Sequence, residues 1–387
     1  MIAITASALF TPLERIDQPI VLIEDGLVTA IHARSTFASP GNARVVDFGN
    51  AILAPAFVDI HIHGAGGQDV MSSNGQPLSS MESVLAQHGV SSYLPTTVTA
   101  PIDLTLSSLD RIADAVEQAA HPNHNGQRAN PQGIHLEGPF LSHVRRGVHP
   151  PENLLRPSMA VFERLWQAAR GHIKLMTIAP ELDGALEVIE NAAKRGVAIS
   201  LGHSDGTLEQ TRAAVTAGAR HATHTFNAMR PLSHHDPGIL GLVLTDSAVS
   251  ADIILDGIHV HPTMVKLFMQ MKRPDDVVLI SDALAATGMP EGHYRLGSFD
   301  IELRGGKCVA GKTLAGSVLT LDRAVRNAMK FGELDAQRAL RAATHNPARV
   351  AGISGQAGTL AAGVPADIVV LNPQYEVIQT IVHGHGL

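Results

Sequence analysis

Short apolar runs rich in β-branched residues alternate with amphipathic segments through the middle of this chain. Such runs predict buried parallel strands, because strands covered on both faces lack polar alternation. The predicted strands cover residues 56–62, 90–98, 132–136, 173–179, 196–201, 219–224, 249–254 and 276–281. Apolar positions at helical spacing predict helices over residues 103–119, 160–169, 185–195, 207–217, 262–272, 319–331 and 335–344.

Strands alternating with helices over roughly 230 residues match an α/β fold of the (β/α)8 TIM-barrel type, whose usual size is ~250 residues. A doubly wound sheet is the alternative. That fold often carries a glycine-rich nucleotide-binding turn after its first strand. Here the first predicted strand ends instead in His61-Ile62-His63. We therefore expect the barrel.

The two ends of the chain share a different pattern, in which short strands follow one another without helices. Residues 19–32 read as two strands around Asp25-Gly26, a strong hairpin signal. Residues 366–371 and 377–382 read as a second pair around Asn372-Pro373. We expect a small β-sandwich domain formed by residues 1–54 and 346–387, with the barrel over 55–345 and an insertion at 292–316.

Composition and charge narrow the function classes. The net charge of −7 and the pI near 6.3 argue against nucleic acid or an anionic membrane as a partner, although a local pocket for a small anion stays open. A single cysteine, Cys308, predicts no intrachain disulfide and makes a reducing cytoplasm the default location. The N-terminal residues do not resemble a signal peptide, and no apolar run approaches the ~20 residues of a membrane span.

Histidine is the compositional outlier, with 21 copies against three tyrosines, one tryptophan and ten phenylalanines. Several histidines and carboxylates stand where predicted strands end. These are His61 and His63 after the first strand, Glu137 after the third, His203 after the fifth, His224 after the sixth and Asp282 after the eighth. Each alone has an ordinary explanation, such as a capped turn or a solvated side chain. Together they should meet, because the carboxyl ends of barrel strands converge on one mouth.

This set of side chains suits metal-assisted hydrolysis. His61 and His63 lie one residue apart, so they point to the same face of a strand and could form half of a metal site. Histidines and a carboxylate bind a divalent ion while leaving a position for water, and the ion lowers the pKa of that water toward ~7. A second carboxylate must then move the proton. Glu137 is placed for metal binding and Asp282 for proton transfer.

The same pattern resembles the amidohydrolase superfamily. In many members a carboxylated lysine after the fourth strand bridges two metals, but the only lysine of the fourth predicted strand, Lys174, lies at its wrong end. With Glu137 in the bridging place, the chain is similar to the family of N-acetylglucosamine-6-phosphate deacetylases. The matching segments are His-Leu-Glu-Gly-Pro-Phe (135–140), His-Thr-Phe-Asn-Ala-Met (224–229), Asp-Gly-Ile-His (256–259), Ser-Asp-Ala (281–283), Leu-Ala-Gly-Ser (314–317), Ala-Thr-His-Asn-Pro-Ala (343–348) and Gly-Thr-Leu-Ala-Ala-Gly (358–363).

The resemblance implies a role for each matching residue. It makes Glu137, His203 and His224 the shared metal ligands, with His61 and His63 supporting a second ion, and Asp282 the general base and then acid. It implies zinc, one or two ions per subunit, and a homodimer. The implied substrate-binding residues, with His149 orienting the N-acetyl carbonyl, are His149, Asn227, Ala228, His259, Leu314, Ala315 and Gly316.

One position departs from the family. An arginine that reaches the sugar phosphate, often across a dimer interface, is replaced here by His235. Arginine binds phosphate through two donors and is always charged, whereas histidine offers one donor and is mostly charged only below about pH 6.5. His235 could bind phosphate more weakly, Arg230 could compensate, or the substrate could lack phosphate. We favour a 6-phosphate substrate.

Two other functions remain open at this stage. The chain could be an amidohydrolase for an unphosphorylated or epimeric N-acetyl sugar or another small amide. It could also be a non-catalytic homologue that serves as a scaffold, although such relatives should lose ligands and this chain keeps every one that the family leads us to expect.

Overall fold

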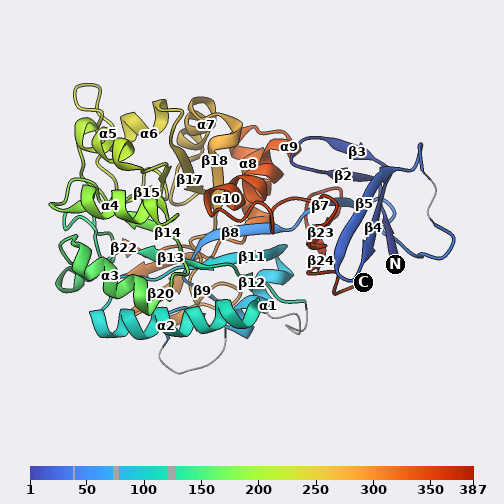
Figure 1. Ribbon diagram of the computed structural model, residues 1–387. Helices are drawn as coiled ribbons and strands as arrows, with labels where there is room; N and C mark the ends of the chain where they lie inside the picture. Colours follow the sequence, from blue (N-terminus) through green and yellow to red (C-terminus); the bar gives the residue numbers. More distant parts are fainter. Residues whose placement is uncertain (38–39, 73–77, 121–126) are drawn as a thin grey trace.

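The computed structural model describes residues 1–37, 40–72, 78–120 and 127–387. Its centre is a set of parallel strands surrounded by helices (Figure 1). The strands are β8 (Phe57–Ile62), β11 (Val90–Pro95), β13 (Ile134–Glu137), β14 (Ile173–Ile178), β15 (Ala198–Leu201), β16 (His221–Ala222), β17 (Ser250–Ile254) and β18 (Val277–Ile280). They pair in chain order, β8 with β11 and then β13 through β18.

Single parallel bridges join the pair β8 and β11 to the sheet formed by β13 through β18. Thr96 pairs with His135 beyond the end of β11, and Ile62 of β8 pairs with Ala283 just after β18. These bridges connect the first strand to the last. The α/β fold of TIM-barrel type that the sequence predicted is therefore confirmed, and each predicted strand is present within a few residues of its expected bounds.

Helices cover the outside of this sheet, and all of those predicted are present. They are α1 (Ser79–Gln87), α2 (Ile102–Ala119), α3 (Met159–Ala168), α4 (Ala185–Lys194), α5 (Leu208–Ala217), α6 (Gly238–Thr245), α7 (Pro262–Met271), α8 (Leu321–Gly332), α9 (Ala336–Ala343) and α10 (His345–Val350), with 3-10 turns at Pro151–Asn153 and Pro274–Asp276. On α2, Leu109, Ile112 and Val116 recur at helical spacing and are buried. Each such side chain contributes roughly 1.5–3 kcal/mol of hydrophobic stabilisation.

The sequence did not predict α1, α6 or α10. In α6 nearly every side chain is apolar and most are buried, so the polar face that reveals a surface helix is missing. The helix α10 is short, and Pro347 near its start reads as a breaker when taken without context. Helical periodicity therefore identifies the exposed helices and misses those that are short or buried.

Strands from both chain ends lie together at one end of the molecule (Figure 1). One sheet has the order β5-β4-β1-β6 and the other β24-β23-β7-β2-β3. Their bounds are β1 (Ile2–Thr5), β2 (Ala8–Phe10), β3 (Arg15–Asp17), β4 (Pro19–Glu24), β5 (Leu27–Ala33), β6 (Arg44–Asp47), β7 (Ile52–Pro55), β23 (Ile368–Leu371) and β24 (Val377–Ile381). The predicted hairpin at Asp25-Gly26 is confirmed, because both residues take the positive φ that a tight turn needs.

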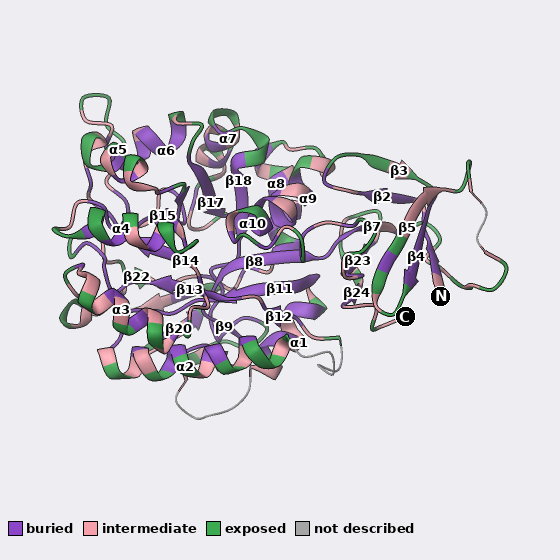
Figure 2. Ribbon diagram, in the orientation of Figure 1, coloured by how far each residue is buried: buried purple, intermediate pink, exposed green. Residues whose placement is uncertain are grey.

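The predicted insertion is a four-stranded antiparallel sheet on the side of the barrel away from the terminal sheets (Figure 1). It consists of β19 (Gly292–Leu296), β20 (Phe299–Arg304), β21 (Lys307–Ala310) and β22 (Thr313–Leu314). Three shorter strands, β9 (Gly64–Ala65), β10 (Gln68–Asp69) and β12 (Asn130–Pro131), complete the structure. Burial concentrates in the parallel strands, and the helices alternate between buried and exposed faces (Figure 2).

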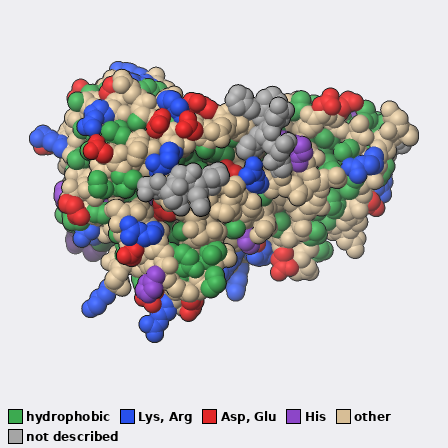
Figure 3. Space-filling view, turned by 90° about the horizontal axis from the view of Figure 1, so that it is seen from below, with side chains coloured by type: hydrophobic (Ala, Val, Ile, Leu, Met, Phe, Trp, Pro, Cys, Tyr) green, Lys and Arg blue, Asp and Glu red, His purple; other side chains and the backbone are tan. Residues whose placement is uncertain are grey.

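On the face shown in Figure 3, acidic and basic side chains lie interspersed among hydrophobic and neutral ones. Within the residues that the structure describes, none of the helices combines the length and the apolar character needed to cross a membrane.

Candidate metal centre and active site

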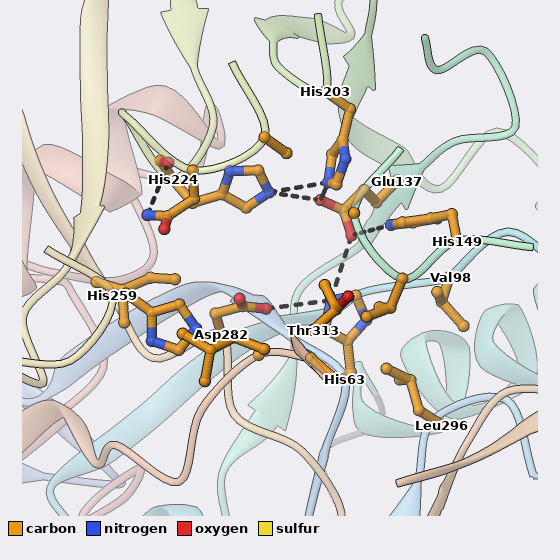
Figure 4. A pocket seen from close by; sticks show the side chains of 18 residues that line it. His63, Val98, Glu137, His149, His203, His224, His259, Asp282, Leu296 and Thr313 are labelled. Carbon is orange, nitrogen blue, oxygen red and sulfur yellow. Dashed lines mark hydrogen bonds and ion pairs between the residues drawn. The ribbon is translucent and has the colours of Figure 1, made fainter. Parts of the chain in front are cut away.

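The carboxyl ends of five parallel strands bring six titratable side chains into one buried cluster, and Figure 4 shows all of them except His61. They are the residues that the sequence placed at the mouth of the barrel, namely His61, His63, Glu137, His203, His224 and Asp282. None is more than 7% exposed. Burial of this many ionisable groups is costly unless they are paired or bind metal.

Glu137 lies between two groups of donors. Its Oε1 is 3.3 Å from His203 Nε2 and 3.2 Å from His224 Nε2, and those two nitrogens are 3.0 Å apart. Its Oε2 is 3.3 Å from His63 Nε2, which lies 3.2 Å from His61 Nε2 and 3.3 Å from Asp282 Oδ1. Glu137 therefore stands where a carboxylate could bind one ion or bridge two.

A left-handed backbone conformation at three of these residues directs their side chains into the cluster. His203, His224 and Asp282 have φ values of 46°, 30° and 48° and each comes two residues after the end of its strand, β15, β16 and β18 respectively. That conformation costs a non-glycine residue of order 1–3 kcal/mol and recurs at functional sites. It also explains why β16 stops at Ala222, shorter than predicted, because the chain turns before His224.

Hydrogen bonds behind the cluster determine which ring nitrogen faces it. His63 Nδ1 lies 3.2 Å from the carbonyl oxygen of Thr96, and His203 Nδ1 lies 3.0 Å from that of Arg145. A carbonyl can only accept, so each Nδ1 carries the proton and donates it. The Nε2 lone pairs of both histidines therefore point into the cluster, as metal ligands require.

His149 has the opposite arrangement. The backbone N–H of Thr99 donates to His149 Nδ1 over 3.2 Å, so Nδ1 accepts and the proton of the neutral ring is on Nε2. That nitrogen lies 3.6 Å from Glu137 Oε2. His149 is close enough to be counted with Glu137 and His203 as a possible metal-binding group. Its tautomer makes it a hydrogen-bond donor, and we assign it to the substrate side.

The donor set fits a divalent ion. Ligand atoms at ~2.0–2.1 Å from a tetrahedral ion lie about 3.3–3.4 Å from one another. The pairs among Glu137, His203 and His224 are 3.0–3.3 Å apart. Facing imidazole lone pairs repel without a cation or proton between them, so an ion among these donors would account for the packing.

Asp282 is held as an anion. Burial disfavours its charged form, but His61, His63 and His224 outweigh this effect and lower the pKa of the carboxyl to about 2. Its backbone N–H donates to the carbonyl oxygen of His61 over 2.9 Å. Asp282 therefore can accept a proton next to the cluster at neutral pH.

A cavity of about 270 Å³ opens onto this cluster. The structure places most of the predicted substrate-binding residues around it: His149, Asn227, Ala228, His259, Leu314, Ala315 and Gly316. His259 Nδ1 lies 2.7 Å from Asp256 Oδ2. Burial works against ionisation of Asp256, but the hydrogen bond and charge of His259 outweigh it and lower the pKa of Asp256.

His235 is the exception among the predicted residues, because it is exposed and does not line the cavity. Its ring lies against that of His234, with centroids 4.0 Å apart and the ring planes tilted by 40°. Arg230 is half-buried and forms an ion pair of 2.9 Å with Asp236. Within one chain, neither side chain is placed at the cavity wall.

The sequence missed six residues of the cavity wall: Val98, Gly147, Val148, Ile254, Leu296 and Thr313. A search for polar side chains at strand ends could not find them, because most are apolar. Val98 and Ile254 do lie at the carboxyl ends of barrel strands, since Val98 comes just after β11 and Ile254 ends β17. Leu296 and Thr313 come from the insertion, whose placement over the mouth only the fold reveals.

Comparison with known proteins agrees with this geometry. Residues 52–386 match the Amidohydrolase family. The chain is 36% identical to an N-acetylgalactosamine-6-phosphate deacetylase of Escherichia coli O157:H7, over 94% of this chain and 93% of the relative. It is 34% identical to an N-acetylglucosamine-6-phosphate deacetylase of Lysinibacillus sphaericus, over 96% of this chain and 93% of the relative.

Solved structures give the same result. One is a mutant N-acetyl-D-glucosamine-6-phosphate deacetylase of Mycobacterium smegmatis in complex with N-acetyl-D-glucosamine-6-phosphate. It superposes with a TM-score of 0.90 at 36% identity, over 99% of this chain and 98% of that one.

Proposed function

This chain belongs to the amidohydrolase family, and from that premise we propose that it hydrolyses the N-acetyl group of N-acetylglucosamine-6-phosphate. The products are glucosamine-6-phosphate and acetate, so the reaction serves amino-sugar catabolism or recycling. The observation that carries the proposal is the pairing of Asp282 with His149 across one cavity, one a proton acceptor and the other a proton donor.

Each residue then has a task in the reaction. Glu137, His203 and His224 would hold the ion that matters most for turnover, and His61 and His63 would support a second. A bound divalent ion, for which zinc is our choice, supplies Lewis acidity to the water and the carbonyl. The N–H of His149 polarises the acetyl carbonyl. Asp282 takes the proton of the attacking water and passes it to the leaving nitrogen.

The rest of the pocket recognises the sugar. Asn227, Ala228 and His259 would contact the sugar, with Leu314, Ala315 and Gly316 on the other side. His235 is proposed to reach the phosphate of a substrate bound by a partner subunit, since it is exposed and outside the cavity of its own chain. This assignment includes a homodimer, and a cytoplasmic location remains our prediction from composition.

The organisation of the chain is part of the same proposal. The two terminal sheets share buried side chains, including Ile4, Val21, Leu53 and Val370. On that basis we propose a β-sandwich domain of residues 1–54 and 346–387, beside a catalytic barrel of residues 55–345.

The epimer N-acetylgalactosamine-6-phosphate is a second candidate substrate. It is favoured by the name of the Escherichia coli relative, which is 36% identical to this chain. The two sugars differ in the orientation of one hydroxyl group, and the same catalytic residues would serve both.

The test is amine release from a panel of substrates by metal-loaded protein. The panel contains both 6-phosphates and the unphosphorylated N-acetyl sugars. We expect the highest kcat/KM for N-acetylglucosamine-6-phosphate. A higher value for its epimer would favour the second candidate, and equal values with and without phosphate would refute a phosphorylated substrate. Asp282→Asn should lower kcat by about 10²–10⁴-fold with metal content unchanged, and equal rates would refute its role.

A further inference from the structure

One wall of the active-site cavity is apolar and continuous with a separate hydrophobic cluster. Val98, Leu296 and Ala315 line the cavity and are at most 3% exposed. They belong to a cluster under the insertion, against which the partly buried Val148 also packs. The side chains behind them in this cluster include those of Met71, Ile301, Leu303 and Cys308.

This wall stands next to His149. Val98 directly precedes Thr99, whose N–H fixes the His149 ring, and Val148 directly precedes His149 itself. Figure 4 shows Val98 next to His149 and Leu296 beyond Val98, both on the side away from His224 and His259. The apolar wall therefore lies on the His149 side of the cavity, away from His224 and His259.

The proposed reaction fixes how an amide lies between these groups. Its carbonyl oxygen faces His149, and its nitrogen, which must receive a proton from Asp282, faces the opposite side with the sugar attached. An amide carbon has only three substituents in one plane. The remaining one, the acyl chain, points away from the sugar, and Val98 and Leu296 line the cavity on the His149 side.

We propose that Val98, Val148 and Leu296 form an acyl subsite that limits the hydrolysed group to about the size of acetyl. The inference rests on the proposed deacetylase function and adds the determinant of acyl length. In the reaction the oxygen of water bonds to the acyl carbon, the C–N bond breaks, and Asp282 transfers the proton of the water to nitrogen. The acyl group leaves as the carboxylic acid, which ionises to the carboxylate and releases the second water proton to solvent, so longer acyl groups would yield the same amine.

Packing behind the wall leaves little room for a longer chain. The N–H of Val98 donates to Met71 Sδ over 3.1 Å, which holds this segment in place. On the other side Gly297 is so close that a Cβ there would lie 2.6 Å from Val98 Cγ1. Gly297 has a φ of +54°, a left-handed conformation that favours glycine at this close approach to Val98. Removing methyl groups from the wall should therefore create space that the structure does not otherwise offer.

The experiment compares kcat/KM for N-acetyl- and N-propionylglucosamine-6-phosphate, measured as amine release by metal-loaded protein. A single methylene in an apolar pocket changes kcat/KM by about 10–200-fold, so the wild type should prefer acetyl at least tenfold. Val98→Ala and Leu296→Ala should each raise the propionyl-to-acetyl ratio about tenfold. Val98→Ile should lower it, and this conservative change guards against a fold defect in the alanine variants.

Ile254→Val is the matched control, because Ile254 also lines the cavity but ends β17, next to the loop that carries His259. It should alter both substrates by the same factor and leave the ratio within twofold of wild type. Acetyl turnover with ratios unmoved by Val98→Ala, Val98→Ile and Leu296→Ala would overturn the acyl subsite alone. Absence of turnover of both substrates by the wild type would refute the deacetylase function and this inference with it.

Discussion

The loop that carries His203 depends on a carboxylate from the neighbouring strand end. Glu181 follows β14, and its Oε2 accepts a hydrogen bond of 2.7 Å from the hydroxyl of Ser204. Its Oε1 accepts one of 2.7 Å from the backbone N–H of Asp205. Both donors come directly after His203. We predict that Glu181→Ala weakens metal binding although Glu181 touches none of the proposed ligands in a described contact.

The expected size follows from these two bonds. A hydrogen bond to a charged group contributes about 1.5–3 kcal/mol. Glu181 is only half-buried, so water replaces part of what the substitution removes. Loss of a group that orients a metal ligand usually costs 10–100-fold in affinity, or about 1.4–2.8 kcal/mol. Glu181→Gln keeps one strong acceptor, so its metal affinity should lie between those of Glu181→Ala and the wild type.

The assay is competition for zinc with a coloured chelator, combined with kcat/KM at rising metal concentration. Excess metal should restore much of the activity of Glu181→Ala, because the catalytic residues are intact. The matched control is Asp183→Ala, two residues away. Asp183 pairs with Arg156, and because these side chains are 75–82% exposed, their ion pair should contribute little to stability or to metal binding. Wild-type zinc affinity in Glu181→Ala, or an equal loss in Asp183→Ala, would refute the reasoning.

Three further predictions test other parts of the chain. His235→Arg should lower KM for a 6-phosphorylated substrate and leave KM for the unphosphorylated sugar unchanged, and an equal change in both would exclude a phosphate contact. Metal analysis should find His63→Asn with at most one ion per chain and measurable turnover, whereas His224→Asn should be inactive. Although burial opposes ionisation of Asp322, the hydrogen bond from His88 and other partners lower its pKa to about 2. The stabilisation that Asp322 provides is therefore complete above about pH 4 and is lost as the pH falls toward 2. Asp322→Asn should reduce the free energy of unfolding by about 1–2 kcal/mol at pH 7 and by less near pH 2.5. Denaturant titration at the two pH values measures this difference.

Local pattern was sufficient to predict the order of strands and helices. The apolar runs are long enough to be recognised singly, and each barrel strand makes its main contacts with the strands before and after it in the chain. The same logic predicted that His61, Glu137 and Asp282 would meet, because the direction of a parallel strand fixes where its carboxyl end lies. Helices without an exposed polar face, such as α6, could not be predicted from helical periodicity.

Position along a strand does not determine which atom of a histidine faces the site. The sequence predicted that His63, His149 and His203 are functional. Only the carbonyl oxygens of Thr96 and Arg145 and the N–H of Thr99 show which ring nitrogen of each carries the proton. Those partners lie 33 to 58 residues away in the chain. Contacts at such separations depend on how the elements pack.

What the sequence determined by itself is the set of titratable side chains that gather and the end of the barrel at which they do so, since the strand period and strand direction are local properties. What only the tertiary structure decided is the surroundings of those groups. It placed Glu137 between two clusters of histidines and Leu296 of the insertion against Val98. It also left His235 outside the cavity of its own chain. These outcomes arise from packing between distant segments, and no local pattern encodes them.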